Sequence, residues 1–257
     1  MTTHRWPSFR VLGRRVDGVQ IHDVMRAMAQ WIARGERGHV IVAANAHVIT
    51  ECHRDALLKE AVDSASIVMP DGMPLVLVGR RAGFNLPDRA YGPMLMETCL
   101  ALSGEHQYRH FFYGGSVETL ERLTKRILSQ WPSTTIAGTY SPPFRALSPD
   151  EQQRIVAMIN DASPDILWVG LGCPKQEHWM HQHRSSLRVP VMIGVGQAFD
   201  LLAGSKQPAP AWMRNHGLEW LFRLAQEPRR LWRRYLIGNP AFIFLVALQL
   251  LGLRKYE

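Results

Sequence analysis

The sequence predicts an α/β protein in which helices flank a mainly parallel β-sheet. Short apolar runs alternate with helix-like segments along the 257 residues, and strands buried in a parallel sheet are apolar runs of this kind. Polar or glycine-rich residues follow most of these runs directly. There is no internal repeat and no low-complexity linker, so the chain fits one large domain or a domain with an appended segment.

The N-terminal part is expected to begin with a strand pair and to continue as alternating helices and strands. The apolar run at 39–44 ends at Asn45, and the run at 66–69 ends at Pro70-Asp71-Gly72. In chain order we expect a hairpin at 9–19, a helix at about 21–34, a strand at 39–44, a helix running on through 61 and a strand at 66–69.

Helix starts are clearer in the second half of the chain. Ser116 can cap a helix to residue 131, after a Gly114-Gly115 turn. Ser148 is followed by Pro149 and, at the capping-box position, by Glu151. The expected strands are 108–113, 135–140, 165–169 and 189–193.

Polar and glycine-rich segments that lie far apart in the sequence each follow a predicted strand. They are Asn45, Asp71, Gly114-Gly115, residues 170–177 and residues 194–200. Parallel strands end at a shared edge of the sheet, and α/β proteins bind ligands at that edge. The sequence therefore predicts that these segments line a single cleft.

Asp71 has two interpretations. It is either a turn aspartate that accepts local backbone N–H bonds beside a glycine that permits a sharp turn, or a general base at the edge of the cleft. Such a base would take the proton from an acceptor hydroxyl as that oxygen attacks an anomeric carbon.

Two glycine turns are candidate phosphate sites. Residues 170–177 read as a strand end, a turn and a helix start, where backbone N–H groups can bind phosphate beside Lys175. Residues 194–200 have a similar pattern. Neither matches a Walker loop or a G-x-G-x-x-G fingerprint, so turn chemistry alone remains an alternative.

The sequence does not favour a bound metal ion. His178, His181 and His183 are spaced so that they scatter around a helix, and no Asp-x-Asp pair is present to hold a divalent ion on a diphosphate. We therefore expect no metal cofactor. Arginine, lysine and helix N-termini must then neutralise any bound pyrophosphate.

Composition and charge leave several partner classes open. With 46% hydrophobic and 20% charged residues the chain is globular, and three scattered cysteines fit a reducing cytosol. Residues 1–9 contain no apolar signal-peptide core. A net charge of +8 indicates an anionic partner, which charge alone does not distinguish among nucleic acid, lipid and nucleotide.

The basic C-terminal part is expected to form an appendage, residues 206–257, on a core of residues 1–205. On a regular helix, Arg229, Arg230, Arg233 and Arg234 would share one arc, opposite to Leu231, Trp232, Tyr235 and Leu236. This pattern fits either a helix at a membrane surface or a surface helix docked on the core. The apolar run at 241–253 favours the membrane but is too short to span it.

Several segments together resemble the WecG/TagA/CpsF family of glycosyltransferases, whose members build bacterial cell-surface polysaccharides. The resemblance covers about residues 11–236. It is carried by Asn45, Pro70-Asp71-Gly72, Arg89 with Gly92, residues 172–177, residues 198–200, and residues 217–224 with 227–230.

The resemblance implies a Rossmann-like fold and a metal-independent, inverting transfer from a UDP-sugar to a sugar linked to undecaprenyl diphosphate. It implies that Asp71 is the base, that Asn45 orients acceptor or sugar, and that C-terminal arginines close over the diphosphate. The other candidate substrate-binding residues are Arg89, Gly114, Gly172, Lys175, Gln176, Glu177, Gln197, Asp200, Arg214, Arg223, Arg229 and Arg230.

The resemblance also implies a cytoplasmic protein that is peripheral on the inner face of the plasma membrane and contacts an anionic surface through its tail. Association between copies of the chain is left open. Ala43 and Met94 depart from the family pattern, which often has threonine and an acid there. Tyr91-Gly92-Pro93 resembles the GumM-type glucosyltransferases, so the expected sugars are glucose or N-acetylmannosamine or its uronic acid.

Two other classes of protein compete with this interpretation. A basic nucleic-acid-binding α/β protein would need arginines along a groove with interleaved aromatics, whereas here they concentrate beside an apolar tail. A nicotinamide-dependent oxidoreductase would need a G-x-G-x-x-G turn near the start, which the chain lacks.

Overall fold

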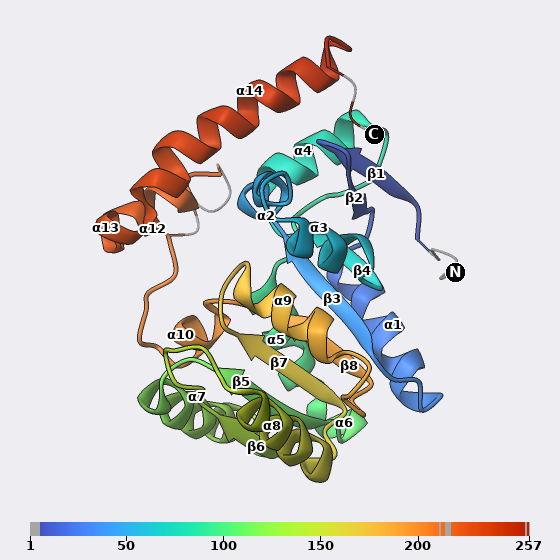
Figure 1. Ribbon diagram of the computed structural model, residues 1–257, viewed down its shortest axis with the longest axis vertical. Coiled ribbons are helices and arrows are strands. Elements are labelled where there is room, and N and C mark those ends of the chain that lie inside the picture. The colour runs from blue at the N-terminus through green and yellow to red at the C-terminus, as the bar shows by residue number, and fades with distance from the viewer. Residues whose placement is uncertain (1–5, 211, 214–216, 255, 257) are drawn as a thin grey trace.

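A six-stranded parallel sheet forms the centre of the molecule (Figure 1). The computed structural model describes residues 6–210, 212–213, 217–254 and 256. The strand order is β4-β3-β8-β7-β5-β6, and each neighbouring pair is parallel. The strands are β3 (His39–Ala44), β4 (Ile67–Pro70), β5 (Arg109–Gly114), β6 (Thr135–Tyr140), β7 (Ile166–Gly170) and β8 (Val191–Gly194). The predicted fold class is confirmed.

A separate antiparallel hairpin packs beside this sheet. It consists of β1 (Ser8–Val11) and β2 (Arg14–Asp17), as expected from the sequence. The buried carboxylate of Asp17 accepts a hydrogen bond from the backbone N–H of Val68 at 2.8 Å, which ties the hairpin to β4.

Helices cover both faces of the sheet because its strands alternate their side chains between two apolar clusters. In β3, Val40, Val42 and Ala44 enter one cluster, and Ile41 and Ala43 enter the other. The first cluster includes side chains of α2 (Ala46–Glu51), α3 (Ala56–Asp63), α4 (Met73–Arg81), α8 (Pro149–Ala162) and α9 (Lys175–His183). The second includes side chains of α1 (Ile21–Ala33), α5 (Gly92–Ala101), α7 (Val117–Gln130) and α10 (Ala198–Leu202), while the short α6 (Ser103–His106) follows α5.

The predicted helix caps at two serines are present. The Ser116 hydroxyl accepts from the Thr119 N–H at 3.1 Å, and Ser148 and Glu151 form the capping box. The helix expected to run through residue 61 is instead interrupted. Asp55 starts a second helix by accepting from the Leu58 N–H at 2.9 Å, because a short polar side chain competes for backbone donors.

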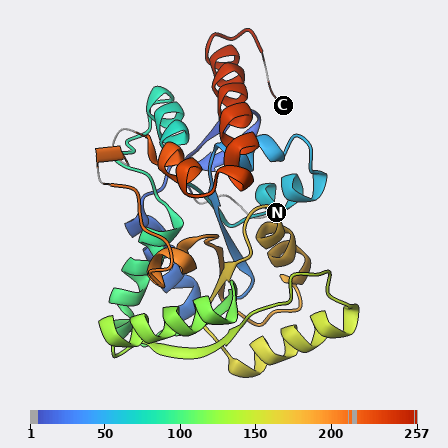
Figure 2. The same cartoon turned by 90° about the vertical axis from the view of Figure 1, so that its left-hand side faces the viewer.

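The C-terminal segment, residues 217–250, folds as four consecutive helical pieces at one end of the molecule. Figure 2 shows its last helix at the opposite end from α7 and α8. The pieces are α12 (Glu219–Gln226), α13 (Pro228–Trp232), the π-helix η1 (Arg233–Gly238) and α14 (Asn239–Leu250). No helix in the described parts of the chain is both long enough and apolar enough to span a bilayer.

The predicted division of this segment into a basic and an apolar arc is wrong. Leu231 and Tyr235 are buried, but Trp232 and Leu236 are exposed, and Arg234 is turned into the protein. Leu231, Arg234 and Tyr235 are spaced i, i+3 and i+4, so they share the helix face that docks on the core, and Trp232 and Leu236 lie off that face.

The helix α14 is docked on the core rather than free. Phe242 and Val246 are buried in the same apolar cluster as the hairpin. The side chain of Gln249 accepts from the Leu12 N–H at 2.7 Å and donates to the Arg10 carbonyl at 2.8 Å. The boundary between residues 205 and 206 stays a prediction.

Candidate active site

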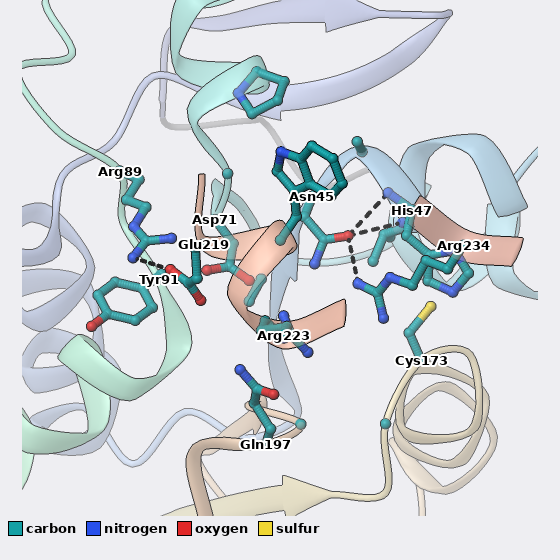
Figure 3. Close-up of a pocket in the computed structure, with 18 of the residues that line it drawn as sticks. Asn45, His47, Asp71, Arg89, Tyr91, Cys173, Gln197, Glu219, Arg223 and Arg234 are labelled. Atoms are coloured by element: carbon teal, nitrogen blue, oxygen red, sulfur yellow. Dashed lines mark hydrogen bonds and ion pairs between the residues drawn. The ribbon is translucent and has the colours of Figure 1, made fainter. Parts of the chain in front are cut away.

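One pocket lies at the carboxyl edge of the sheet, where the segments after four strands meet (Figure 3). Asn45 follows β3, Asp71 follows β4, Gly172 follows β7 and Gly196 follows β8. The predicted gathering of strand ends is therefore confirmed for these segments. The C-terminal segment adds Gly217, Glu219, Trp220, Arg223, Arg230, Arg234, Tyr235 and Asn239 to the lining.

Asp71 extends directly from the parallel ladder. Its N–H donates to the Ala44 carbonyl at 2.8 Å, which fixes the backbone beside the end of β3. Gly72 has an extended φ of −136° that any residue adopts, and it is the N-cap of α4. The expected sharp glycine turn is therefore absent, and the start of α4 sets the direction of the chain here.

The Asp71 carboxyl group is held near the midpoint of its titration at neutral pH. Burial raises its pKa from 3.8 to about 7. Arg89 and Arg223 act in the opposite direction, Glu219 raises the pKa further, and a hydrogen bond from Asn45 lowers it. A carboxylate with this pKa can take a proton from a hydroxyl group and release it again at physiological pH.

Asn45 is oriented by the helix that it begins. Its side-chain oxygen accepts from the N–H groups of His47 at 3.1 Å and Val48 at 3.3 Å, which caps α2. The amide group of Asn45 lies beside Asp71 (Figure 3) and lowers the pKa of its carboxyl group. The sequence did not predict this effect of Asn45 on the carboxyl group.

Arg89 reaches the pocket from the segment before α5. Its guanidinium lies 2.6 Å from the carboxylate of Glu219 and 4.1 Å from the centre of the Tyr91 ring. Both charged side chains are largely buried. Figure 3 shows the Glu219 and Asp71 carboxylates next to each other in the pocket.

Arg223 and Arg234 bring positive charge from the C-terminal segment. Their guanidinium groups lie 5.9 Å and 5.5 Å from the Tyr235 ring, and Arg234 also reaches the Asn45 oxygen at 3.5 Å. The Nε atoms of both arginines are buried without a hydrogen-bond partner among the described residues. Burial, followed by these two arginines, lowers the pKa of the neighbouring His47 to about 4, so its ring is neutral at pH 7.

Positive charge exceeds negative charge in the described lining of the pocket. Arg230 also lines it and pairs with Glu227. The charged lining residues are Arg89, Arg223, Arg230 and Arg234 against Asp71 and Glu219. The pocket is therefore suited to an anionic ligand.

One backbone amide in each predicted phosphate-binding turn, at residues 170–177 and 194–200, already has a side-chain partner. The Gln176 side-chain oxygen accepts from the N–H groups of Gly172 and Gly196, each at 3.1 Å. Gln176 is itself buried and joins the two loops. Gly172, Gln176 and Gln197 do line the pocket, but the two glycine amides are already hydrogen-bonded.

Five other predicted site residues lie outside the lining of this pocket. A Cβ at Gly114 would lie 2.6 Å from the Gly170 backbone, so this glycine allows β5 and β7 to approach closely. Glu177 is buried beneath the loop, where it accepts from the Gln176 amide at 2.8 Å. Asp200 pairs with Lys206 at 2.9 Å.

The remaining two of these five, Lys175 and Arg229, are exposed on the surface. Arg214, which was also predicted to bind substrate, lies outside the described residues.

Two of the three histidines on α9 have separate polar partners, and the Nε2 atom of His183 is buried without a hydrogen-bond partner among the described residues. His178 lies 2.9 Å from a carboxylate oxygen of Asp55, and His181 lies 3.2 Å from the Ser64 hydroxyl. In the described part of the chain, no three His, Cys, Asp or Glu side chains are grouped as a metal site requires.

The lining residues that were absent from the predicted set include His47, Tyr91, Glu219 and Arg234. Tyr91 and Glu219 lie beside Arg89 in the fold, although Glu219 is far from it in sequence. Their places in the motifs around Gly92 and Gly217 were the available signal. Nothing local in the sequence distinguishes Arg234 from the neighbouring arginines, because its place in the pocket depends on which helix face docks on the core.

The carboxyl edge of this parallel sheet holds a carboxyl group with a near-neutral pKa among arginines. These are features of an enzyme that acts on an anionic substrate. Residues 9–256 match the sequence model of the glycosyl transferase WecG/TagA/CpsF family. The chain belongs to this family and is a glycosyltransferase. This membership overturns the nucleic-acid-binding and oxidoreductase alternatives.

Curated relatives cover most of the chain. A protein of Bacillus spizizenii named N-acetylglucosaminyldiphosphoundecaprenol N-acetyl-beta-D-mannosaminyltransferase is 31% identical over 210 residues, which are 82% of this chain and 79% of the relative. A protein of Staphylococcus aureus with the same name is 26% identical over 238 residues, or 92% of this chain and 91% of the relative.

Proposed function

We propose that this glycosyltransferase moves N-acetylmannosamine from a UDP-linked donor to N-acetylglucosamine carried on undecaprenyl diphosphate. The names of the relatives supply the transferred sugar and the acceptor. The observation that carries the proposal is Asp71, whose near-neutral carboxyl group lies among arginines at the sheet edge.

The proposed reaction is a single displacement with inversion at the anomeric carbon. The acceptor hydroxyl loses its proton to Asp71 while its oxygen bonds to that carbon. The bond between the carbon and the diphosphate oxygen breaks on the opposite side, and its electrons leave with UDP. Asn45, which lowers the pKa of Asp71, is proposed to orient the Asp71 carboxylate through its amide.

Arginines are proposed to neutralise the departing diphosphate without a metal ion. Arg223 and Arg234 support this role because their buried Nε donors have no protein partner among the described residues. A guanidinium provides planar donors that match phosphate oxygens. The donor is therefore expected to bind beneath the C-terminal segment.

The sugar preference is proposed from the relatives rather than from the Tyr91-Gly92-Pro93 segment. That segment suggested glucose, but the relatives give glucose no support because they are named as N-acetylmannosaminyltransferases. Tyr91 contacts Arg89 through its ring, so the structure gives it a role that does not require a glucose donor.

The enzyme is also proposed to work at the inner face of the plasma membrane as a peripheral protein. Exposed apolar side chains on the C-terminal segment support this, because a docked helix does not otherwise present them to water. They are Trp232, Leu236, Ile237, Ile243, Phe244, Leu250 and Leu251. Three free cysteines fit a reducing compartment.

A panel of UDP-sugars offered with an acceptor bearing N-acetylglucosamine on a lipid diphosphate tests the proposal. UDP-N-acetylmannosamine should give the highest kcat/KM, and saturating EDTA should leave the rate unchanged. Preference for UDP-glucose would refute the sugar assignment. Loss of activity with EDTA and its recovery with magnesium would refute metal independence.

A further inference from the structure

The charged groups around Asp71 come from separate parts of the chain. Arg89 precedes α5, Glu219 and Arg223 belong to α12, and the charge of Arg234 on η1 also faces the carboxylate. Asn45, at the start of α2, is a neutral hydrogen-bond donor. The environment of the carboxylate thus depends on the C-terminal segment as well as on the sheet.

Arg89 is close to two carboxylates but pairs with the one from the C-terminal segment. Its Nη2 atom lies 2.6 Å from Glu219, and its guanidinium stacks 4.1 Å from the Tyr91 ring (Figure 3). An arginine paired directly with Asp71 would stabilise the anion and make it a weaker base. The position of Arg89 therefore affects how strong a base Asp71 is.

We infer that Glu219 is a positioning residue that holds Arg89 away from Asp71 and so keeps Asp71 a stronger base. This inference rests on the proposed role of Asp71 as the base. The direction of two electrostatic effects agrees with it, since Arg89 lowers the pKa of Asp71 and Glu219 raises it.

The test is the dependence of kcat/KM on pH for Glu219→Gln, measured in the full chain. The acid limb should move to lower pH by roughly one unit, the low end of the effect of an arginine on a neighbouring aspartate. The plateau should fall about threefold, because a carboxylate with a lower pKa is a weaker base. An acid limb that stays in place would overturn the inference, whether or not the plateau falls.

Matched variants separate the electrostatic effect from a structural one. Glu227→Gln removes a carboxylate from the same segment that pairs with Arg230 and Lys206, and should leave the acid limb where it is. Glu219→Asp keeps the negative charge, so its acid limb should lie close to the pH of the parent enzyme's acid limb. A shift with Glu227→Gln, or no rescue with Glu219→Asp, would contradict the inference.

A double variant tests whether Glu219 acts through Arg89. In an Arg89→Gln background, Glu219→Gln should move the acid limb much less than in the parent background, because only the direct effect of its charge on Asp71 remains. A full shift in that background would overturn the inference. Normal turnover of Asp71→Asn would refute the proposed function itself. If Asp71→Asn is inactive but the acid limb of Glu219→Gln stays at the parent pH, only this inference is refuted.

Discussion

Asp71 differs from an ordinary aspartate because the fold removes it from water without giving it a direct arginine partner. Burial is the largest effect on its pKa, and Arg89, the nearest counter-charge candidate, is paired with Glu219. The same environment that makes the carboxylate basic also makes its charged form costly to bury. Reactivity and stability are therefore opposed at this residue.

The first residue-scale prediction concerns turnover. The kcat/KM of the parent enzyme should rise with pH through about 7, as Asp71 loses its proton. Asp71→Asn should lower turnover by roughly two orders of magnitude or more at every pH. Asp150→Asn, at an exposed position on α8, is the control and should have no effect. Near-normal turnover of Asp71→Asn would remove Asp71 from the mechanism.

The second residue-scale prediction concerns stability. In the unfolded chain Asp71 ionises near its ordinary pKa of 3.8, but in the folded protein it ionises near 7. The folded state therefore loses stability as pH rises between these values. Asp71→Asn should raise Tm by a few degrees above pH 7, and the gain should disappear below about pH 4. Calorimetry that finds a gain independent of pH would contradict this account.

The elements of the sheet could be predicted from sequence, whereas the last helices could not. Runs such as 39–44 are apolar enough to be central strands, and Ser116 and Ser148 carry cap signals within a few residues. The break at Asp55 and the π-helix at Arg233–Gly238 depend on competing local bonds and on tertiary contacts. Periodicity therefore placed the sheet edge correctly but assigned the wrong faces after residue 228.

The same distinction explains what could be foreseen of the site. Asn45 and Asp71 follow recognisable strands, so their common location could be predicted. The pairing of Arg89 with Glu219 joins residues that are far apart in sequence. The Gln176 side chain accepts hydrogen bonds from two glycine amides, and this depends on the relative position of two loops. No local pattern contains that information.

Helix α14 provides an element-scale prediction, because adjacent residues on it face different environments. Phe242 is 2% exposed, whereas Ile243 and Phe244 are 63% and 64% exposed. Phe242→Ser should lower the free energy of unfolding by about 3 kcal/mol through loss of core contacts. Ile243→Ser with Phe244→Ser should leave Tm unchanged but weaken cosedimentation with anionic vesicles. Equal vesicle binding by the double variant and the parent would rule out α14 as the membrane contact.

At the scale of the whole molecule, the C-terminal segment connects the pocket to the proposed membrane surface. Arg223 and Arg234 face the pocket, while Ile243 and Phe244 face outward further along the same segment. A lipid-linked acceptor is held at the bilayer surface. One docked segment can therefore bring the apolar membrane contact and the charge for the donor's leaving diphosphate to the same end of the sheet.

These two roles of the segment can be separated with two acceptors in full-length protein. Ile243→Ser with Phe244→Ser should reduce turnover of a long-chain acceptor in anionic vesicles, because less enzyme is at the surface, and should spare a short soluble acceptor. Arg223→Gln with Arg234→Gln should reduce turnover of both acceptors, because these arginines are proposed to stabilise the leaving diphosphate. High salt should weaken only the vesicle reaction of the parent, since surface attraction is screened more than buried contacts. If the arginine variant turned over the soluble acceptor at the parent rate, the segment would be an anchor without a catalytic part.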